Sequence, residues 1–149
     1  MSEQNNKDFD FDTQCAKAKI DEKKLEQILI SGKVELKTEC GIWHNSGNIA
    51  IEYESHGKPS GIAATKADYW AHELRTKDNQ TLAYLVFPTP ILRKICNKLM
   101  DEEGNWRRGG EGNNMEMVLV NLEKVLIGLQ NFSGPGDNSF LTRRERERK

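Results

Sequence analysis

The sequence lacks any long hydrophobic run, and it contains few cysteines. No apolar stretch approaches the ~20 residues of a membrane-spanning helix, and the first residues contain no hydrophobic core of the kind that a secretion signal has. The three cysteines, Cys15, Cys40 and Cys96, are an odd number without close spacing. This pattern argues against a disulfide framework or a zinc site, and it favours a reducing compartment such as the cytoplasm.

The sequence also lacks a strong net charge. The formal net charge of the 149 residues is −1, so no overall field draws the protein onto nucleic acid or anionic lipid. Any affinity for DNA must therefore come from local patches. The three histidines, His44, His56 and His72, lie in separate segments without the spacing of a metal site or a catalytic triad.

The pattern of elements predicts an α/β fold in which a central mixed sheet is flanked by helices. We expect a flexible N-terminal arm over residues 1–12, one domain over 13–132 and a basic C-terminal tail over 133–149. Within the domain the expected order is a helix at 13–31, strands at 34–37 and 48–53, a short helix near 65–70, a hairpin over 71–87, a helix at 90–103, a strand at 115–120 and a helix at 122–129.

The predicted functional residues lie on the two strands expected at 34–37 and 48–53. Both alternate polar with β-branched or aromatic residues, and the intervening residues 40–47 are rich in Gly, Asn and Ser, which predicts a hairpin. Antiparallel pairing places Glu35 opposite Glu52 and Lys37 opposite Ala50. These charged groups then share one face. Two opposed carboxylates repel each other, so we expect a cation to offset the repulsion.

Glu22 is a further acidic candidate. It falls on the apolar stripe of the predicted helix at 13–31, close to Leu25. An acid on the inward face of a helix is paired, holds a cation, or extends its carboxylate to water. The sequence leaves these alternatives open.

Three segments in this order resemble the PD-(D/E)xK nuclease superfamily, and in particular its small phage-encoded members. They are residues 35–39 (ELKTE), 47–55 (GNIAIEYES) and 57–62 (GKPSGI), followed by ADYW at 67–70. The resemblance covers roughly residues 9 to 126. It implies a restriction-endonuclease-like fold and a DNA nuclease that requires Mg²⁺ or Mn²⁺.

The resemblance also implies roles for individual residues. Glu35 and Glu52 would hold the metal, Lys37 would orient or activate the attacking water, and Glu22 would complete the metal shell. Mg²⁺ suits such a site because it prefers oxygen ligands and is often bound by one or two carboxylates with waters and phosphate. The sequence departs from the family pattern, since the usual aspartate on the preceding strand has no counterpart.

Two alignments with the family pattern therefore remain. In the first, Glu35 and Lys37 form the signature triplet, and Glu22 or Glu26 supplies the missing acid. In the second, Glu35 is the first acid, Glu52 is the second, and Lys37 supplies the amine from the neighbouring strand. The predicted hairpin favours the second alignment, because it brings the three groups together.

Two further groups are candidates for contact with nucleic acid. Lys58 and Ser60 lie in the turn after residue 55, where their ammonium and hydroxyl groups suit a phosphate. Trp106, Arg107 and Arg108 combine stacking with charge in a glycine-rich segment. The tail 143–149 carries five basic and two acidic residues and also suits phosphates. An ordinary turn, a flexible surface loop and a solvated terminus are the structural alternatives.

The predicted function is a metal-dependent nuclease acting on DNA in phage recombination, repair or degradation, in the cytoplasm of the host cell; the sequence leaves endonuclease and exonuclease action open. Resolution of branched DNA by a homodimer is an analogy with small members of the superfamily. The alternative is a catalytically inactive protein of the same fold that binds nucleic acid or a host protein, in a regulatory or anti-defence role.

Overall fold

The computed structural model describes residues 22–40 and 43–149, in two compact units that divide after Gly32. In the first unit, residues 22–31 form a helix, and the N–H of Gly32 donates to the carbonyls of Gln27 and Ile28 at its end. The predicted end of this helix is therefore confirmed. Its predicted start and the predicted arm at 1–12 lie outside the described residues.

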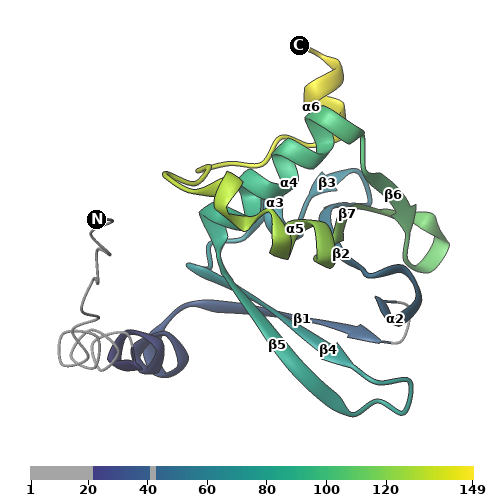
Figure 1. Cartoon of the computed structure of the whole chain (residues 1–149). Helices are drawn as coiled ribbons and strands as arrows, with labels where there is room; N and C mark the ends of the chain where they lie inside the picture. The colour runs from purple at the N-terminus through teal and green to yellow at the C-terminus, as the bar shows by residue number, and fades with distance from the viewer. Residues whose placement is uncertain (1–21, 41–42) are drawn as a thin grey trace, which may run out of the picture. The chain divides into compact units, whose positions relative to one another are not determined.

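The second unit contains two β-sheets (Figure 1). The three-stranded sheet has the order β1-β4-β5, with β1 (Val34–Cys40) parallel to β4 (Tyr69–Arg75) and β5 (Thr81–Pro88) antiparallel to β4. The four-stranded sheet has the order β3-β2-β7-β6 and is antiparallel throughout. Its strands are β3 (Lys58–Pro59), β2 (Asn48–Ser55), β7 (Met115–Asn121) and β6 (Trp106–Gly109).

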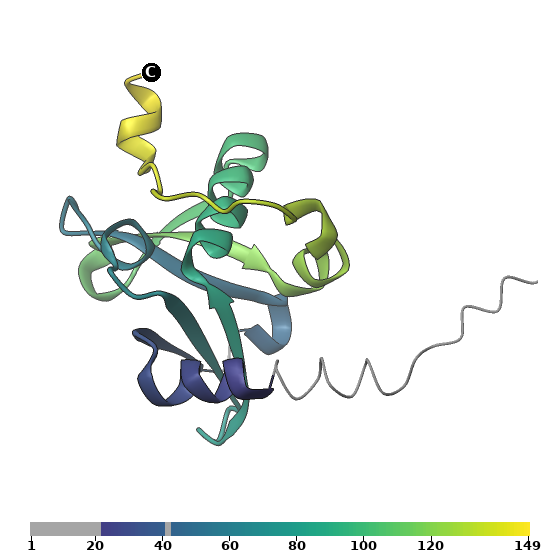
Figure 2. The same ribbon diagram turned by 90° about the vertical axis from the view of Figure 1, so that its left-hand side faces the viewer.

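Helices flank these sheets, so the unit is an α/β fold with a mixed sheet. The longest described helix of this unit is α4 (Thr89–Glu103), whose ribbon is seen from a second side in Figure 2. It packs against β7 and ends at Gly104 in the left-handed conformation. The remaining helical elements are α2 (Trp43–Ser46), α3 (Gly61–Ala64), η1 (Glu111–Asn113), α5 (Leu122–Ile127), η2 (Leu129–Phe132) and α6 (Arg143–Glu147).

Both sheets contribute to one hydrophobic core. Ile49 and Ile51 of β2 alternate inward, and Val118 and Val120 of β7 face the same way. Trp70 of β4 is fully buried in the same cluster. Alternation along each strand therefore determines which residues of β2 and β7 enter the core, as the sequence predicts.

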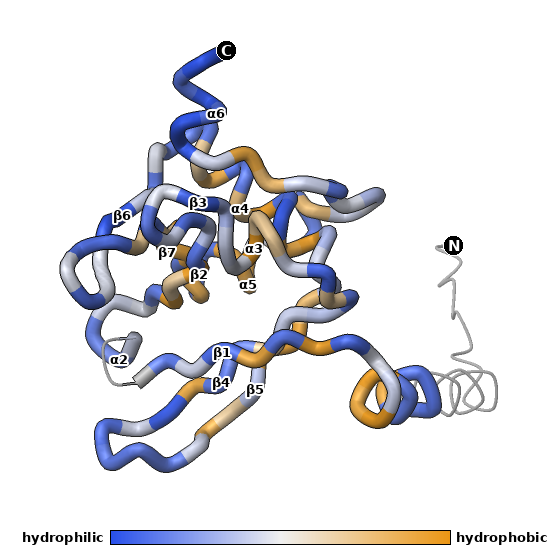
Figure 3. Tube along the Cα trace, turned by 180° about the vertical axis from the view of Figure 1, so that it is seen from behind, coloured by the Kyte–Doolittle hydropathy of each residue, from blue (hydrophilic) through white to orange (hydrophobic). Residues whose placement is uncertain are grey.

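The opposite face of the three-stranded sheet is partly apolar and exposed. Leu36 on β1 and Val86 on β5 both flank Ala71 of β4, and Tyr84 lies one row further along β5. Leu36 and Tyr84 are more than half exposed. Hydrophobic stretches on β1 and β5 are visible in Figure 3.

The pairing of the first two strands differs from the prediction. The strands at 34–37 and 48–53 exist, but β1 pairs with β4 and β2 pairs with β7. The predicted hairpin is therefore wrong, and helix α2 lies in the expected hairpin loop. The short helix precedes Thr65 instead of following it, and residues 69–70 begin β4. The hairpin between β4 and β5 is confirmed.

Candidate active site

A row of charged side chains follows one face of β1. Glu35, Lys37 and Glu39 alternate with the exposed residues of the strand, and they share the side of the sheet that carries Trp70 and His72 of β4. The Nζ atom of Lys37 lies 3.1 Å from Oε1 of Glu35 and 5.8 Å from the centroid of the Trp70 ring. The side chains of Lys37 and Glu35 are 39% and 27% exposed, so solvent reaches both.

Glu39 links this row to β2. Its Oε1 atom accepts the N–H of Ala50 at 2.6 Å, and the buried Nε2 of His72 lies 3.3 Å from the same oxygen without the geometry of a hydrogen bond. The Nδ1 of His72 accepts the indole N–H of Trp70 at 3.3 Å. Glu39, two residues after Lys37 on β1, therefore contacts the backbone of β2 at Ala50. Ala50 lies two residues before Glu52.

Glu52 is held by the turn that follows β2. Its Oε1 accepts a short hydrogen bond from the Ser60 hydroxyl. Gly61 has φ +47°, and a Cβ atom at this position would lie only 2.2 Å from the carbonyl oxygen of Glu52. Glycine is therefore required for the close approach of this turn to β2. Lys58, which pairs with Ser55 between β3 and β2, is exposed.

The acidic candidates do not form the predicted pair. Glu35 and Glu52 belong to different sheets, so the expectation that they lie opposite each other is wrong. Glu22 is exposed and belongs to the first unit. Within residues 22–40 and 43–149, no three Asp, Glu, His or Cys side chains form a group that could hold a metal ion. The metal-binding roles of Glu22, Glu35 and Glu52 remain predictions.

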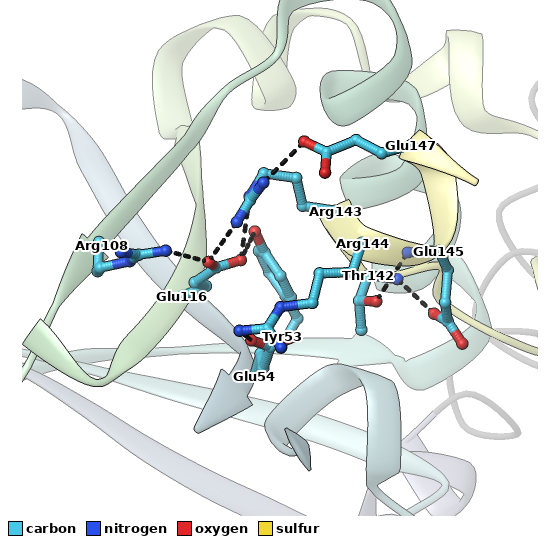
Figure 4. Close-up of polar contacts among 9 residues, drawn as sticks. All are labelled: Tyr53, Glu54, Arg108, Glu116, Thr142, Arg143, Arg144, Glu145 and Glu147. Carbon is cyan, nitrogen blue, oxygen red and sulfur yellow. Dashed lines mark hydrogen bonds and ion pairs between the residues drawn. The ribbon is translucent and has the colours of Figure 1, made fainter. Parts of the chain in front are cut away.

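A cross-strand pair of acids does occur near the C-terminal end of β2, two residues after Glu52. Glu54 and Glu116 are partners between β2 and β7, next to a β-bulge, and both are almost fully buried. Arg143 and Arg108 each bring a guanidinium nitrogen to 2.9 Å from Glu116, and the Tyr53 hydroxyl donates to it at 3.0 Å (Figure 4).

Arginines supply the positive charge at this acid pair. Burial alone would raise the pKa of Glu116, but hydrogen bonds from Arg143, Arg108 and Tyr53 outweigh this effect and lower the pKa to about 2. Arg144 lies 3.3 Å from Glu54. Cations thus offset the repulsion between opposed carboxylates, as expected on physical grounds. They do so at Glu54 and Glu116, a pair that the sequence did not indicate. The bulge after Glu52 interrupts the alternation that could have identified it.

The residues expected to stack on nucleic acid are engaged within the protein. Trp106, Arg107 and Arg108 lie on strand β6, where a glycine-rich loop was expected. The guanidinium of Arg143 lies 4.5 Å from the centroid of the Trp106 ring. Arg107 donates to the carbonyl of Trp106, and Arg108 pairs with Glu116. Their role in nucleic-acid binding remains a prediction.

The basic segment at the C-terminus is helical in part. Thr142 accepts the N–H of Glu145, whose carboxylate accepts the N–H of Thr142, so a capping box begins α6. Arg146 pairs with Asp101 of α4. Three arginines of the segment, Arg143, Arg144 and Arg146, thus pair with acids of the sheet and of α4, whereas Arg148 and Lys149 are exposed.

Comparisons with models of known protein families, with curated proteins and with solved structures found no match. None of the helices in the described residues is long and apolar enough to cross a membrane. Cys96 is a free, buried cysteine whose thiol pKa is raised by burial.

Proposed function

We propose that this protein is a Mg²⁺-dependent deoxyribonuclease in which Glu35 holds the metal and Lys37 positions the attacking water. The observation that carries the proposal is the Glu35–Lys37 pair itself, an acid and an amine 3.1 Å apart on one face of β1 and both open to solvent. The order of the three resembling segments supports the same function.

The donor chemistry suits the metal. Mg²⁺ commonly takes only one or two carboxylates from the protein, with waters and a substrate phosphate in the other positions. Glu35 supplies one carboxylate, and Glu52 is the candidate for a second. A bound divalent ion supplies charge stabilisation at the phosphate. The chain's own part is to orient these groups, which Ser60 does for Glu52 through its hydroxyl.

The Glu39 contact supports the link between the two candidate acids. By accepting the N–H of Ala50, Glu39 fixes the end of β1 against β2. Glu35 and Lys37 lie on the same face of β1 as Glu39, and Glu52 lies two residues beyond Ala50. This hydrogen bond between strands of different sheets therefore adds to the shared hydrophobic core in holding the parts of the proposed site together.

A second candidate function is binding of nucleic acid or of a host protein without cleavage. The distribution of the acidic candidates over two sheets favours it. Both functions predict a stable fold, but they differ in the response to a metal ion.

The test combines metal titration with DNA cleavage. We expect calorimetry to detect Mg²⁺ or Mn²⁺ binding that Glu35→Ala removes. We also expect cleavage of plasmid, single-stranded or four-way-junction DNA, and Lys37→Ala should slow it by roughly 10²-fold or more. Lys98→Ala is the matched control, because Lys98 also pairs with a glutamate and lies 5.2 Å from an aromatic ring centroid, that of Phe132.

Two results would contradict the nuclease. One is wild-type protein that neither binds the ions nor cuts any of these DNAs; DNA binding without cleavage would then support the second function. The other is cleavage that survives in both Glu35→Ala and Lys37→Ala, which would remove this pair from the mechanism.

A further inference from the structure

Strand β5 forms one edge of the three-stranded sheet (Figure 1). Within the described residues it pairs with β4 alone, so its outer edge presents backbone N–H and C=O groups to no other strand. Residues 81–84 are exposed in succession, although successive side chains of a strand point to opposite faces of the sheet. Solvent therefore reaches both faces of this part of β5 as well as its edge.

The edge of β5 has little of the protection that edge strands usually carry. Charged side chains, proline, bulges and short length are the common ways in which a protein prevents an edge strand from pairing with another chain. Of the four edge strands in the described residues, β1, β3 and β6 each contain a charged residue, whereas the eight residues of β5 contain none. A bulge opposite Arg75 and the terminal Pro88 affect only the two ends of β5. The middle of the strand is thus an apolar edge without a charge that would oppose pairing.

The exposed apolar side chains of β5 are arranged symmetrically along the strand. Leu82, Tyr84 and Val86 alternate with the other residues of the strand and are 58%, 57% and 38% exposed. In an antiparallel pair of two β5 strands centred on Tyr84, Leu82 lies opposite Val86 of the partner subunit, and Tyr84 lies opposite Tyr84 of the partner subunit. This is the register in which all three exposed side chains meet one another. Aromatic and β-branched cross-strand pairs stabilise a sheet.

This symmetry favours a second copy of the chain over an unrelated partner. Around a two-fold axis the same surface meets itself, so the surface must be complementary to itself. A strand whose apolar pattern reads the same in both directions, and which contains no charge, meets this condition.

We propose that a second copy of this chain pairs with the outer edge of β5, so that the three-stranded sheets of two copies join into one continuous sheet. Main-chain hydrogen bonds between the two β5 strands provide the affinity, as in other cases of strand addition, and the side chains of Leu82, Tyr84 and Val86 determine the register. The Glu35–Lys37 pair lies on β1, at the opposite edge of the sheet. The inference therefore holds whether or not the protein cuts DNA.

Sedimentation velocity over a range of protein concentrations measures this association. We expect the wild type to form a species with the mass of two chains as the concentration rises. Tyr84→Lys should weaken the association about tenfold or more, because it places two like charges directly opposite each other. Tyr84 is exposed, so circular dichroism should show that this variant stays folded. The matched control is Leu36→Lys, which adds the same charge at an exposed residue of β1, at the other edge of the sheet, and should leave the association unchanged.

Two double variants test the register. Leu82→Lys with Val86→Lys places like charges opposite each other, whereas Leu82→Glu with Val86→Lys places unlike charges there. We expect the second variant to associate about tenfold or more tightly than the first, and we expect high salt to reduce this difference.

Three results would overturn the proposal. The first is wild-type protein that remains a single chain at every concentration measured. The second is Leu36→Lys that weakens the association as much as Tyr84→Lys does, which would indicate packing through the exposed face of the sheet instead of its edge. The third is equal association of the two double variants, which would exclude the pairing centred on Tyr84.

Discussion

Glu116 shows how a single buried carboxylate can depend on several partners. Its side chain is 4% exposed and contacts Arg108, Arg143 and Tyr53. Desolvation of a charge is unfavourable, and here hydrogen bonds from two guanidinium groups and a hydroxyl offset it. Removal of the carboxylate would leave the guanidinium of Arg143, which is 21% exposed, without its main counterion.

We therefore expect Glu116→Ala to lower the free energy of unfolding by roughly 3–5 kcal/mol, the usual cost of breaking a buried ion pair by removing one partner. Urea denaturation followed by circular dichroism measures the change. Glu102→Ala is the control, since Glu102 forms an exposed i,i+4 pair with Lys98 that contributes at most about 0.5 kcal/mol. Equal losses in the two variants would contradict the role assigned to Glu116.

At the scale of elements, the sequence predicts local structure better than strand partners. A helix was expected at 90–103, and α4 covers these residues and ends at Gly104 in the left-handed conformation. The turn between β4 and β5 was also expected, and the N–H of Thr76 donates to the carbonyl of Gln80 there. These features depend on neighbouring residues, whose chemistry is visible in the sequence.

The partner of β1 depends on residues far along the chain. Alternation showed that Glu35 and Lys37 share a face, which the structure confirms, but it could not show whether β2 or β4 lies beside that strand. Val34 pairs with Tyr69, and nothing in the residues between them specifies this long-range pairing. The prediction that Glu35 and Glu52 converge is wrong for this reason, because it required β2 instead of β4 beside β1.

Helix α6 provides a test at the scale of one element. Truncation after Thr142 removes Arg143 and Arg144 and leaves Glu54 and Glu116 opposed on adjacent strands. We expect a loss of about 3 kcal/mol in the free energy of unfolding, because Glu54 loses Arg144 and Glu116 loses Arg143, keeping only Arg108.

Hydrogen exchange should locate the effect of this truncation. Exchange should become faster in β2 and β7 near the bulge, and stay unchanged in the hairpin of β4 and β5. The matched control is truncation after Glu147, which removes two basic residues and keeps the helix with its ion pairs. If both truncations have the same stability, α6 does not stabilise the sheet.

At the scale of the whole molecule, each sheet of the second unit contains one acid with a strongly lowered pKa. In the four-stranded sheet this acid is Glu116. In the three-stranded sheet, Glu73 accepts hydrogen bonds from Arg75, Thr81 and Thr38. Those from Arg75 and Thr81 contribute most to lowering its pKa to about 2.

These shifts predict the direction of the pH dependence. Both carboxyls have ordinary values near 4.5, and the folded-state pKa of each is about 2. Between these values the unfolded chain binds more protons than the folded protein, so stability must fall as the pH falls. The contribution is complete above about pH 5 and is lost progressively towards pH 2.

We expect the urea midpoint to decrease steadily over this range. Glu116→Gln should make the decrease shallower, because glutamine does not titrate, and Glu102→Gln should leave its slope unchanged. A midpoint that is constant between pH 5 and pH 2, or a Glu116→Gln slope equal to that of the wild type, would show that these carboxylates do not couple protonation to folding.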